Sequence, residues 1–315
     1  MSRDLPGLVA GARAGRTRDV ARLISLIEDG GPDVPALMGE LASTSGHASV
    51  IGITGSPGVG KSTTTSALIT ALRARGQKVG VLAVDPSSPF SGGALLGDRI
   101  RMQEHATDEG VFIRSMASRG HLGGLAATTP QVLRVLDAAG CDVVLIETVG
   151  VGQSEVEVAA AADTTLVLLA PGMGDSIQAA KAGILEIGDV FVVNKADRDG
   201  ADSTVRELRN MIALGEREER GWKPPVVRTV ATTGSGIDDL IATIDEHRAW
   251  LAESGELEAR RVRRARDEVE ALALALMRRA LLAGAGADRL AEAAADVAAG
   301  RSDPHTAAAR LVAEA

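Results

Sequence analysis

Short apolar runs alternate with longer amphipathic or alanine-rich segments between residue 50 and about residue 250. Runs that are almost uniformly apolar are typical of strands buried on both faces of a parallel sheet, and the segments between them are typical of covering helices. We therefore predict an α/β fold with a mostly parallel, doubly wound sheet, in which ligands bind at the carboxyl ends of the strands. The predicted strands are residues 50–54, 79–84, 143–146, 165–169, 190–193 and 226–230.

The two ends of the chain lack strand signals and predict helical extensions. We expect an N-terminal helical extension (1–48), a nucleotide domain (49–250) and a C-terminal helical arm (251–315). The first extension is interpreted as a structural cap. The apolar face of the arm needs burial, which favours a dimerisation arm over helices packed back on the domain. The predicted helices are two short ones before residue 42, the second over 34–41, and three near 256–283, 287–299 and 304–313.

The first predicted strand leads into a complete phosphate-binding loop of the pattern G-x-x-x-x-G-K-S, which a helix-like stretch follows. In such a loop, backbone N–H groups and the helix N-terminus surround the β-phosphate. Lys61 can reach the β- and γ-phosphates, and the Ser62 hydroxyl can bind Mg²⁺. The strand–loop–helix order predicts a P-loop NTPase rather than a glycine-rich turn that binds nothing. The expected nucleotide-binding residues are Gly55, Ser56, Pro57, Gly58, Val59, Gly60, Lys61, Ser62 and Thr63.

An N-K-x-D motif follows the predicted strand at 190–193 and contains Asn194, Lys195 and Asp197. The Asp197 carboxylate can accept two hydrogen bonds from the N1–H and the exocyclic amine of guanine, a donor pair that adenine lacks, while the Lys195 stem covers the base. The motif therefore predicts GTP and GDP as the nucleotides. Ala231 and Thr232, after the last strand, can supply a backbone contact to the guanine oxygen.

Acidic residues follow two further strands. Glu147 can bind Mg²⁺ through a water or orient an attacking water, and the Gly150 amide can sense the γ-phosphate. Asp85 ends its strand beside the expected metal, and Asp98 lies in a glycine-rich segment that can close on it, although a solvated helix-start carboxylate is the alternative for Asp98. We expect Mg²⁺ among Ser62, Asp85, Asp98 and Glu147, and catalytic roles for Lys61, Asp98 and Glu147.

Asp175, Gln178 and Lys181 lie three residues apart after the fourth predicted strand and would share one face of a helix. Polar residues on one face are typical of solvent exposure. A glycine-rich approach to this segment and the scarcity of lysine in the chain favour a switch role instead.

The composition limits the other functions that the chain can have. With 315 residues, 45% hydrophobic and 24% charged, it is typical of a folded globular protein. A net charge of −8 gives no indication of a nucleic-acid surface, and a single cysteine excludes an internal disulfide. We find no apolar leader or membrane-spanning run, so we expect a cytoplasmic protein without a membrane partner.

Several strings of residues resemble one family in the same order along the chain. They are Val84-Asp85-Pro86-Ser87-Ser88-Pro89-Phe90, Gly92-Gly93 with Leu96-Gly97-Asp98-Arg99, Glu147-Thr148-Val149-Gly150-Val151-Gly152-Gln153-Ser154-Glu155, and Val193-Asn194-Lys195-Ala196-Asp197. Over about residues 50 to 250 the chain resembles the methylmalonyl-CoA mutase-associated GTPases (MeaB/ArgK type), in the class that also contains the signal-recognition and nickel-insertion GTPases.

The resemblance implies a homodimeric G protein that hydrolyses GTP to GDP and phosphate. It further implies a chaperone that gates cofactor loading of an adenosylcobalamin-dependent acyl-CoA mutase and protects that enzyme from inactivation. Asp85, Asp98 and Glu147 would surround the metal and the attacking water, and the segment 175–181 would relay the nucleotide state. Two alternatives stay open: a nickel-insertion metallochaperone, disfavoured by one cysteine and five scattered histidines, and a phosphotransferase acting on a transport protein.

Overall fold

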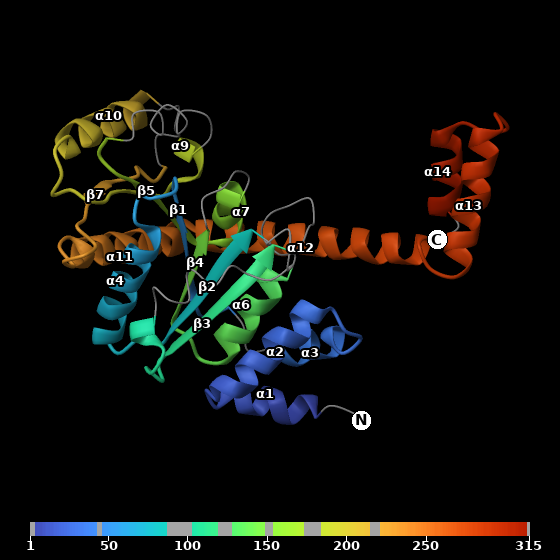
Figure 1. The fold of residues 1–315 in the computed structure, drawn as a ribbon, viewed down its shortest axis with the longest axis horizontal. Coiled ribbons are helices and arrows are strands. Elements are labelled where there is room, and N and C mark those ends of the chain that lie inside the picture. Colours follow the sequence, from blue (N-terminus) through green and yellow to red (C-terminus); the bar gives the residue numbers. More distant parts are fainter. Residues whose placement is uncertain are drawn as a thin grey trace. The chain divides into compact units, whose positions relative to one another are not determined.

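The structure, a computed structural model, describes residues 4–42, 46–86, 103–118, 128–148, 154–172, 184–214 and 221–313. The chain divides into two compact units, residues 1–260 and 261–315. The first unit contains a parallel sheet with the strand order β3-β2-β4-β1-β5-β6-β7, which confirms the predicted doubly wound α/β fold (Figure 1). The strands are β1 (Ser49–Thr54), β2 (Val79–Pro86), β3 (Val111–Ser118), β4 (Val143–Thr148), β5 (Thr164–Leu169), β6 (Val190–Val193) and β7 (Val226–Arg228).

Strand β3 is missing from the sequence-based prediction, which was wrong at this point. It pairs with β2 alone and forms an edge of the sheet, so most of its side chains are only partly buried. Ser115 and Ser118 interrupt the apolar run in its second half, and Arg114 in its centre pairs with Glu28 of the N-terminal helices. A strand covered on one side in this way does not show the uniformly apolar pattern of the central strands.

Helices cover both faces of the sheet. On one face, α4 (Lys61–Ala74) and α11 (Ile237–Ser254) pack against β1, β4, β5 and β6, and Leu68, Ile69 and Ile241 lie in this part of the core. The other face is covered by α6 (Thr129–Ala138), α7 (Ser154–Ala161) and α10 (Ala201–Leu214). A short helix, α9 (Ile184–Ile187), precedes β6. This two-sided cover is the reason the central strands are buried and apolar.

The N-terminal extension forms three helices, where the sequence predicted two: α1 (Leu5–Arg13), α2 (Thr17–Asp29) and α3 (Val34–Leu41). The first predicted helix is divided at Gly15, whose φ of 75° lies in the left-handed region. Leu23, Ile24 and Leu37 are fully buried in a cluster that also includes residues of α6 and of β2 and β4. The extension is therefore part of the hydrophobic core of the first unit.

The C-terminal segment is helical as predicted, with α12 (Glu256–Leu281), α13 (Ala285–Ala298) and α14 (Pro304–Ala313). In the second unit, Ala293, Ala307 and Leu311 form a small core between α13 and α14. None of the residues of α12 is buried, and several of its large apolar side chains are exposed.

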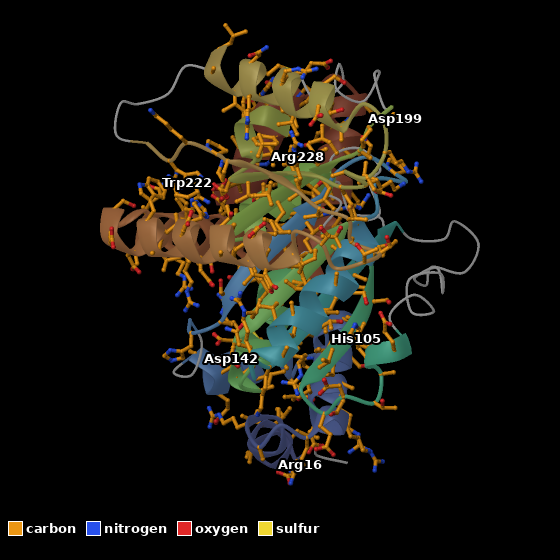
Figure 2. The ribbon with its side chains drawn as sticks, turned by 90° about the vertical axis from the view of Figure 1, so that its left-hand side faces the viewer. Arg16, His105, Asp142, Asp199, Trp222 and Arg228 are labelled. Carbon is orange, nitrogen blue, oxygen red and sulfur yellow. The ribbon has the colours of Figure 1, made fainter. Side chains whose placement is uncertain are left out.

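Both tryptophans of the chain contact His247 of α11 and each other, at the amino ends of β5 and β6. Trp222 of this cluster is labelled in Figure 2. The His247 ring is fully buried, its Nδ1 lies 2.9 Å from the Thr164 hydroxyl, and its Nε2 lies 3.4 Å from Asp189 Oδ1. Arg260 donates to both oxygens of Asp189, at 2.9 and 3.0 Å. Burial lowers the pKa of His247 from 6.5 to about 4, against the opposing pull of the Asp189 charge.

Candidate functional site

The predicted phosphate loop joins the carboxyl end of β1 to the first turn of α4. Two of its glycines are required by the backbone. Gly55 has a φ of 142°, and a Cβ at this position would lie 2.3 Å from the Leu168 carbonyl oxygen. Gly60 has a φ of 100°, and a Cβ there would lie 2.4 Å from Asn194 Nδ2. The loop can therefore keep its path beside β5 and the Asn194 loop only with glycine at both positions.

Lys61, the first residue of α4, folds back over this loop. Its Nζ donates to the carbonyl oxygens of Gly55 at 2.7 Å and Ser56 at 3.3 Å, and the side chain is buried. The ammonium group thus lies inside the curve of the loop, beside the positive end of the α4 dipole. The Lys61 ammonium group and the N–H groups of the first turn of α4 lie at the same place, and together they form the kind of anion-binding site that the sequence predicts.

A hydroxyl–carboxylate cluster lies next to the loop. Glu147, near the end of β4, accepts from the Ser62 hydroxyl at 2.6 Å and from the Thr65 hydroxyl at 2.9 Å, each through a different oxygen. All three side chains are buried. The sequence predicted Ser62 and Glu147 but not Thr65, because the contact with Thr65 depends on the distance between α4 and β4 and not on a motif.

Mg²⁺ prefers hard oxygen ligands, and the Ser62 hydroxyl and Glu147 carboxylate are such ligands. The Ser62 hydroxyl donates its hydrogen to Glu147, and a hydroxyl oxygen carries two lone pairs that can bind a cation. The two residues therefore fit a magnesium site. Asp85 belongs to β2, where its backbone is in register with Ala117, and its side chain lies outside the described residues.

Five further predicted residues lie outside the described part of the chain. They are Asp98 of the expected metal site, Gly150 of the expected γ-phosphate contact, and Asp175, Gln178 and Lys181 of the expected switch.

The guanine-type loop follows β6 and is tied directly to the phosphate loop. The Asn194 Nδ2 donates to the Val59 carbonyl at 2.9 Å, and the Asn194 Oδ1 accepts from the Ala231 N–H at 3.1 Å. Lys195 Nζ donates to the Gly58 carbonyl at 2.6 Å. Lys195 has a φ of 56° and is the only non-glycine residue with positive φ in the described segments. Such a conformation persists only when its surroundings enforce it, and it aims the Lys195 side chain at the phosphate loop.

Asp197 is exposed two residues beyond Lys195. Ala231 and Thr232 begin a turn that is closed by a bridge between Val230 and Ser235. Since the Ala231 N–H already donates to Asn194, that side chain connects the phosphate loop to the turn after β7. The reading of guanine by Asn194 and Asp197 stays a prediction.

A second polar contact on α4 was not predicted from the sequence. Ser66 Oγ lies 2.9 Å from His105 Nε2 and also contacts the Glu104 carboxylate. Figure 2 labels His105. Both partners belong to the 3₁₀ turn Gln103–His105, which begins the described part of the connection to β3. The neighbouring residues Thr65 and Ser66 of α4 therefore contact two different segments, Glu147 of β4 and the 3₁₀ turn at 103–105.

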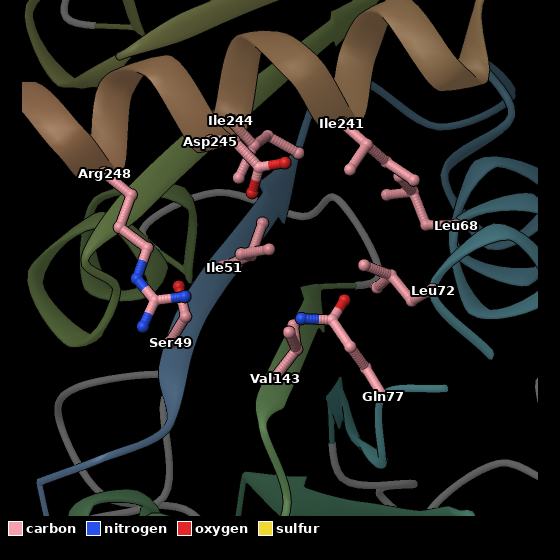
Figure 3. Close-up of a pocket in the computed structure, with 10 residues that line it drawn as sticks. All are labelled: Ser49, Ile51, Leu68, Leu72, Gln77, Val143, Ile241, Ile244, Asp245 and Arg248. Carbon is pink, nitrogen blue, oxygen red and sulfur yellow. The ribbon is translucent and has the colours of Figure 1, made fainter. Parts of the chain in front are cut away.

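Other possible sites are weaker. A small pocket at the opposite end of the sheet lies between β1, β4, α4 and α11 and is lined by Ser49, Gln77, Asp245 and Arg248 together with apolar side chains (Figure 3). Its volume of about 10 Å³ corresponds to about one water. No group of three histidine, cysteine or acidic side chains suited to a metal occurs within the described residues. None of the helices in that part of the chain is long and apolar enough to cross a membrane.

The phosphate loop, bound through two side chains to a loop of the guanine-reading type, defines a P-loop GTPase. The family model described as methylmalonyl Co-A mutase-associated GTPase MeaB matches residues 20–285. The chain belongs to this family, and hydrolysis of GTP is accordingly its activity.

Individual relatives agree with this assignment. The chain is similar to a GTPase of Pyrococcus horikoshii, with 51% identity over 267 residues, 84% of each chain. It is also similar to the GTPase ArgK of Escherichia coli, with 39% identity over 254 residues, 78% of this chain and 76% of that protein. Among solved structures, one described as a LAO/AO transport system kinase matches with a TM-score of 0.73 and 27% identity over 99% of this chain and 98% of that chain.

Proposed function

We propose that this GTPase acts in the cytoplasm as a chaperone that gates cofactor loading of an adenosylcobalamin-dependent acyl-CoA mutase and protects that mutase. The observation that carries the proposal is the match of residues 20–285 to a family described by its association with methylmalonyl-CoA mutase. Hydrolysis of the bound GTP would set how long the protein stays in its GTP-bound state. The phosphate and guanine loops would respond together to the nucleotide, because Asn194 and Lys195 connect them.

In the proposed mechanism, Lys61 leaves the Gly55 carbonyl and binds the β- and γ-phosphate oxygens. Ser62 and Glu147, with Asp85 and Asp98, would bind Mg²⁺, which when present neutralises the charge that develops on the phosphates. Glu147 orients the attacking water directly or through Ser62. The guanine base lies at Asp197, with the Lys195 stem against its face.

The response to the nucleotide is proposed to pass through Asp175, Gln178 and Lys181 to the mutase. The exposed apolar side chains of α12 support a homodimer. Val262, Val269 and Leu276 recur every seven residues, with Leu272 three residues after Val269, and the four are 58%, 67%, 62% and 43% exposed in that order. Such a stripe on a long helix is typical of a surface that a second helix covers.

The nucleotide part of the proposal is tested by calorimetry with GTP, GDP and ATP. We expect Asp197→Asn to reduce GTP affinity by about 100-fold while ATP binding stays weak, because the charged carboxylate that accepts from both guanine donors is replaced by a neutral amide with a single acceptor oxygen. Asp199→Asn, two residues further along the same loop, is the matched control. An unchanged preference for GTP in Asp197→Asn would contradict the assignment of this loop.

The chaperone part is tested with a purified methylmalonyl-CoA mutase. We expect transfer of adenosylcobalamin to the mutase to depend on GTP, and Lys181→Ala to weaken mutase-stimulated hydrolysis but not basal hydrolysis. Cofactor transfer that is identical with and without GTP would contradict the proposal.

One alternative is supported by a specific observation, the similarity to a solved structure described as a transport system kinase. A phosphotransferase would move the γ-phosphate to a protein hydroxyl, whereas a GTPase moves it to water. Labelled γ-phosphate recovered on a protein rather than as inorganic phosphate would favour the kinase.

A further inference from the structure

Thr65 lies one helical turn after Ser62, on the same side of α4. The two residues donate to the two different oxygens of Glu147, at 2.6 Å from Ser62 and 2.9 Å from Thr65. The Thr65 side chain is fully buried, and Glu147 is only 3% exposed. The carboxylate is therefore held at both ends by hydroxyls of a single helix.

The two hydroxyls differ in what else they can do. Ser62 is the residue that the magnesium site would engage, so its geometry changes with the nucleotide state. Thr65 has one hydrogen and two acceptors within reach, Glu147 Oε2 at 2.9 Å and the carbonyl oxygen of Lys61 at 3.0 Å. An ionised carboxylate accepts only, and a hydrogen bond to a charged acceptor is stronger than one to a carbonyl. The Thr65 hydroxyl therefore donates its hydrogen to the Glu147 carboxylate rather than to the Lys61 carbonyl.

We propose that Thr65 is the positioning residue for Glu147: it fixes Oε2 so that Oε1 faces Ser62, the metal site and the attacking water. The inference rests on the proposed role of Glu147. Thr65 lies one turn further along α4 from the phosphate loop than Ser62, and its hydroxyl contacts the carboxylate oxygen that Ser62 does not. Loss of this hydroxyl should therefore affect the chemical step and the use of Mg²⁺ rather than the binding of the nucleotide.

The test compares Thr65→Val, which removes the hydroxyl at nearly constant shape, with Thr65→Ser, which keeps it. Thr64→Val is the matched control, since Thr64 is equally buried on α4 and its hydroxyl has no hydrogen-bond partner among the described residues. We expect kcat for GTP hydrolysis to fall by about 10- to 100-fold in Thr65→Val, as for the loss of a hydrogen bond to a charged group. Thr65→Ser and Thr64→Val should keep the wild-type kcat.

A second readout does not depend on turnover. Calorimetric titration with GDP should give the wild-type affinity for Thr65→Val in EDTA, and a smaller gain in affinity on adding Mg²⁺ than the wild-type chain shows. A purely structural defect would weaken GDP binding equally in both conditions and would overturn the inference. If Thr65→Val does not fold, Thr65→Ala replaces it in both measurements.

Glu147→Gln separates failure of this inference from failure of the proposed function. If Glu147→Gln hydrolyses GTP at the wild-type rate, the role of Glu147 is wrong and the inference falls with it. If Glu147→Gln is slow but Thr65→Val is not, the positioning role of Thr65 alone is overturned. In the double variant, Thr65→Val should cause no further loss of kcat, because both changes act through the same carboxylate.

Discussion

His247 is expected to make the stability of the protein depend on pH in a measurable way. Its ring is fully buried against Trp222 and Trp250, with centroid distances of 4.8 and 5.8 Å, and burial lowers its pKa to about 4. In the unfolded chain the same imidazole returns to an ordinary pKa near 6.5. Between these two values, the unfolded state binds a proton that the folded state excludes.

The sign follows from this difference. Because the folded pKa is depressed, the contribution of His247 to the free energy of unfolding is complete above about pH 6.5. It is lost as the pH falls towards about 4. For a folded pKa of about 4, the loss between pH 7 and pH 5 is about 2 kcal/mol, and between pH 7 and pH 4 about 3 kcal/mol. Since the ring is fully buried, solvent screening does not reduce this figure.

Urea unfolding at pH 7, 6 and 5 measures the effect. The chain has two tryptophans and no tyrosine, and both tryptophans contact this site, so tryptophan emission follows its unfolding directly. His247→Phe keeps an aromatic ring against the two indoles but cannot take up a proton. We expect the wild-type chain to lose about 2 kcal/mol more than His247→Phe between pH 7 and pH 5. Parallel pH dependence of the two proteins would refute the reasoning.

Three further predictions concern the loops around the sheet. Gly55→Ala should abolish GDP binding in calorimetry and lower the free energy of unfolding by more than about 2 kcal/mol, because the new Cβ would lie 2.3 Å from the Leu168 carbonyl oxygen. A variant that binds GDP with wild-type affinity would contradict this prediction. Asp137→Ala should lower the free energy of unfolding by about 2 kcal/mol in urea titration, since the Asp137 carboxylate accepts hydrogen bonds from the backbone N–H groups of Gly46, His47 and Ala48. A decrease below about 0.5 kcal/mol would be too small for a carboxylate with these three bonds. Arg260→Lys should lower the melting temperature in 1 M salt as well as in 0.1 M salt, because a lysine cannot reproduce the paired hydrogen bonds to Asp189. A melting temperature that falls only in 0.1 M salt would instead indicate a solvent-screened surface ion pair.

The central part of the fold could be predicted from the sequence because its strands are buried on both faces. Burial of this kind leaves a local signal, a run of apolar residues, and the five inner strands of the described sheet carry it. The edge strand β7 is only partly buried, but its two adjacent valines still gave an apolar run. The edge strand β3 lacks a continuous apolar run, because it pairs with β2 alone and its central residue Arg114 forms an ion pair with Glu28 of α2. The break between α1 and α2 was missed because apolar residues continue at helical spacing through it.

The candidate site divides in the same way. The phosphate loop and the loop at Asn194 are contiguous motifs, so their residues could be named in advance. The contacts of Glu147 with Thr65, and of Ser66 with His105, join segments 82 and 39 residues apart in the chain. Such contacts depend on how closely a helix packs on a strand or a turn, which no local pattern specifies. The connecting role of Asn194 was missed for the same reason.

The central position of β1 has a consequence for the time at which the nucleotide site can form. This strand pairs with β4 and β5 and not with β2, which follows it along the chain. During synthesis the ribosome must therefore add roughly 90 residues after β1 before its first partner, β4, exists. At about 5–20 residues per second this interval lasts on the order of 5 to 20 seconds. Throughout it, the apolar strand β1 and the glycine-rich loop after it have no partner strand, so nascent chains of this protein should need protection from aggregation until β4, which ends at Thr148, has left the exit tunnel.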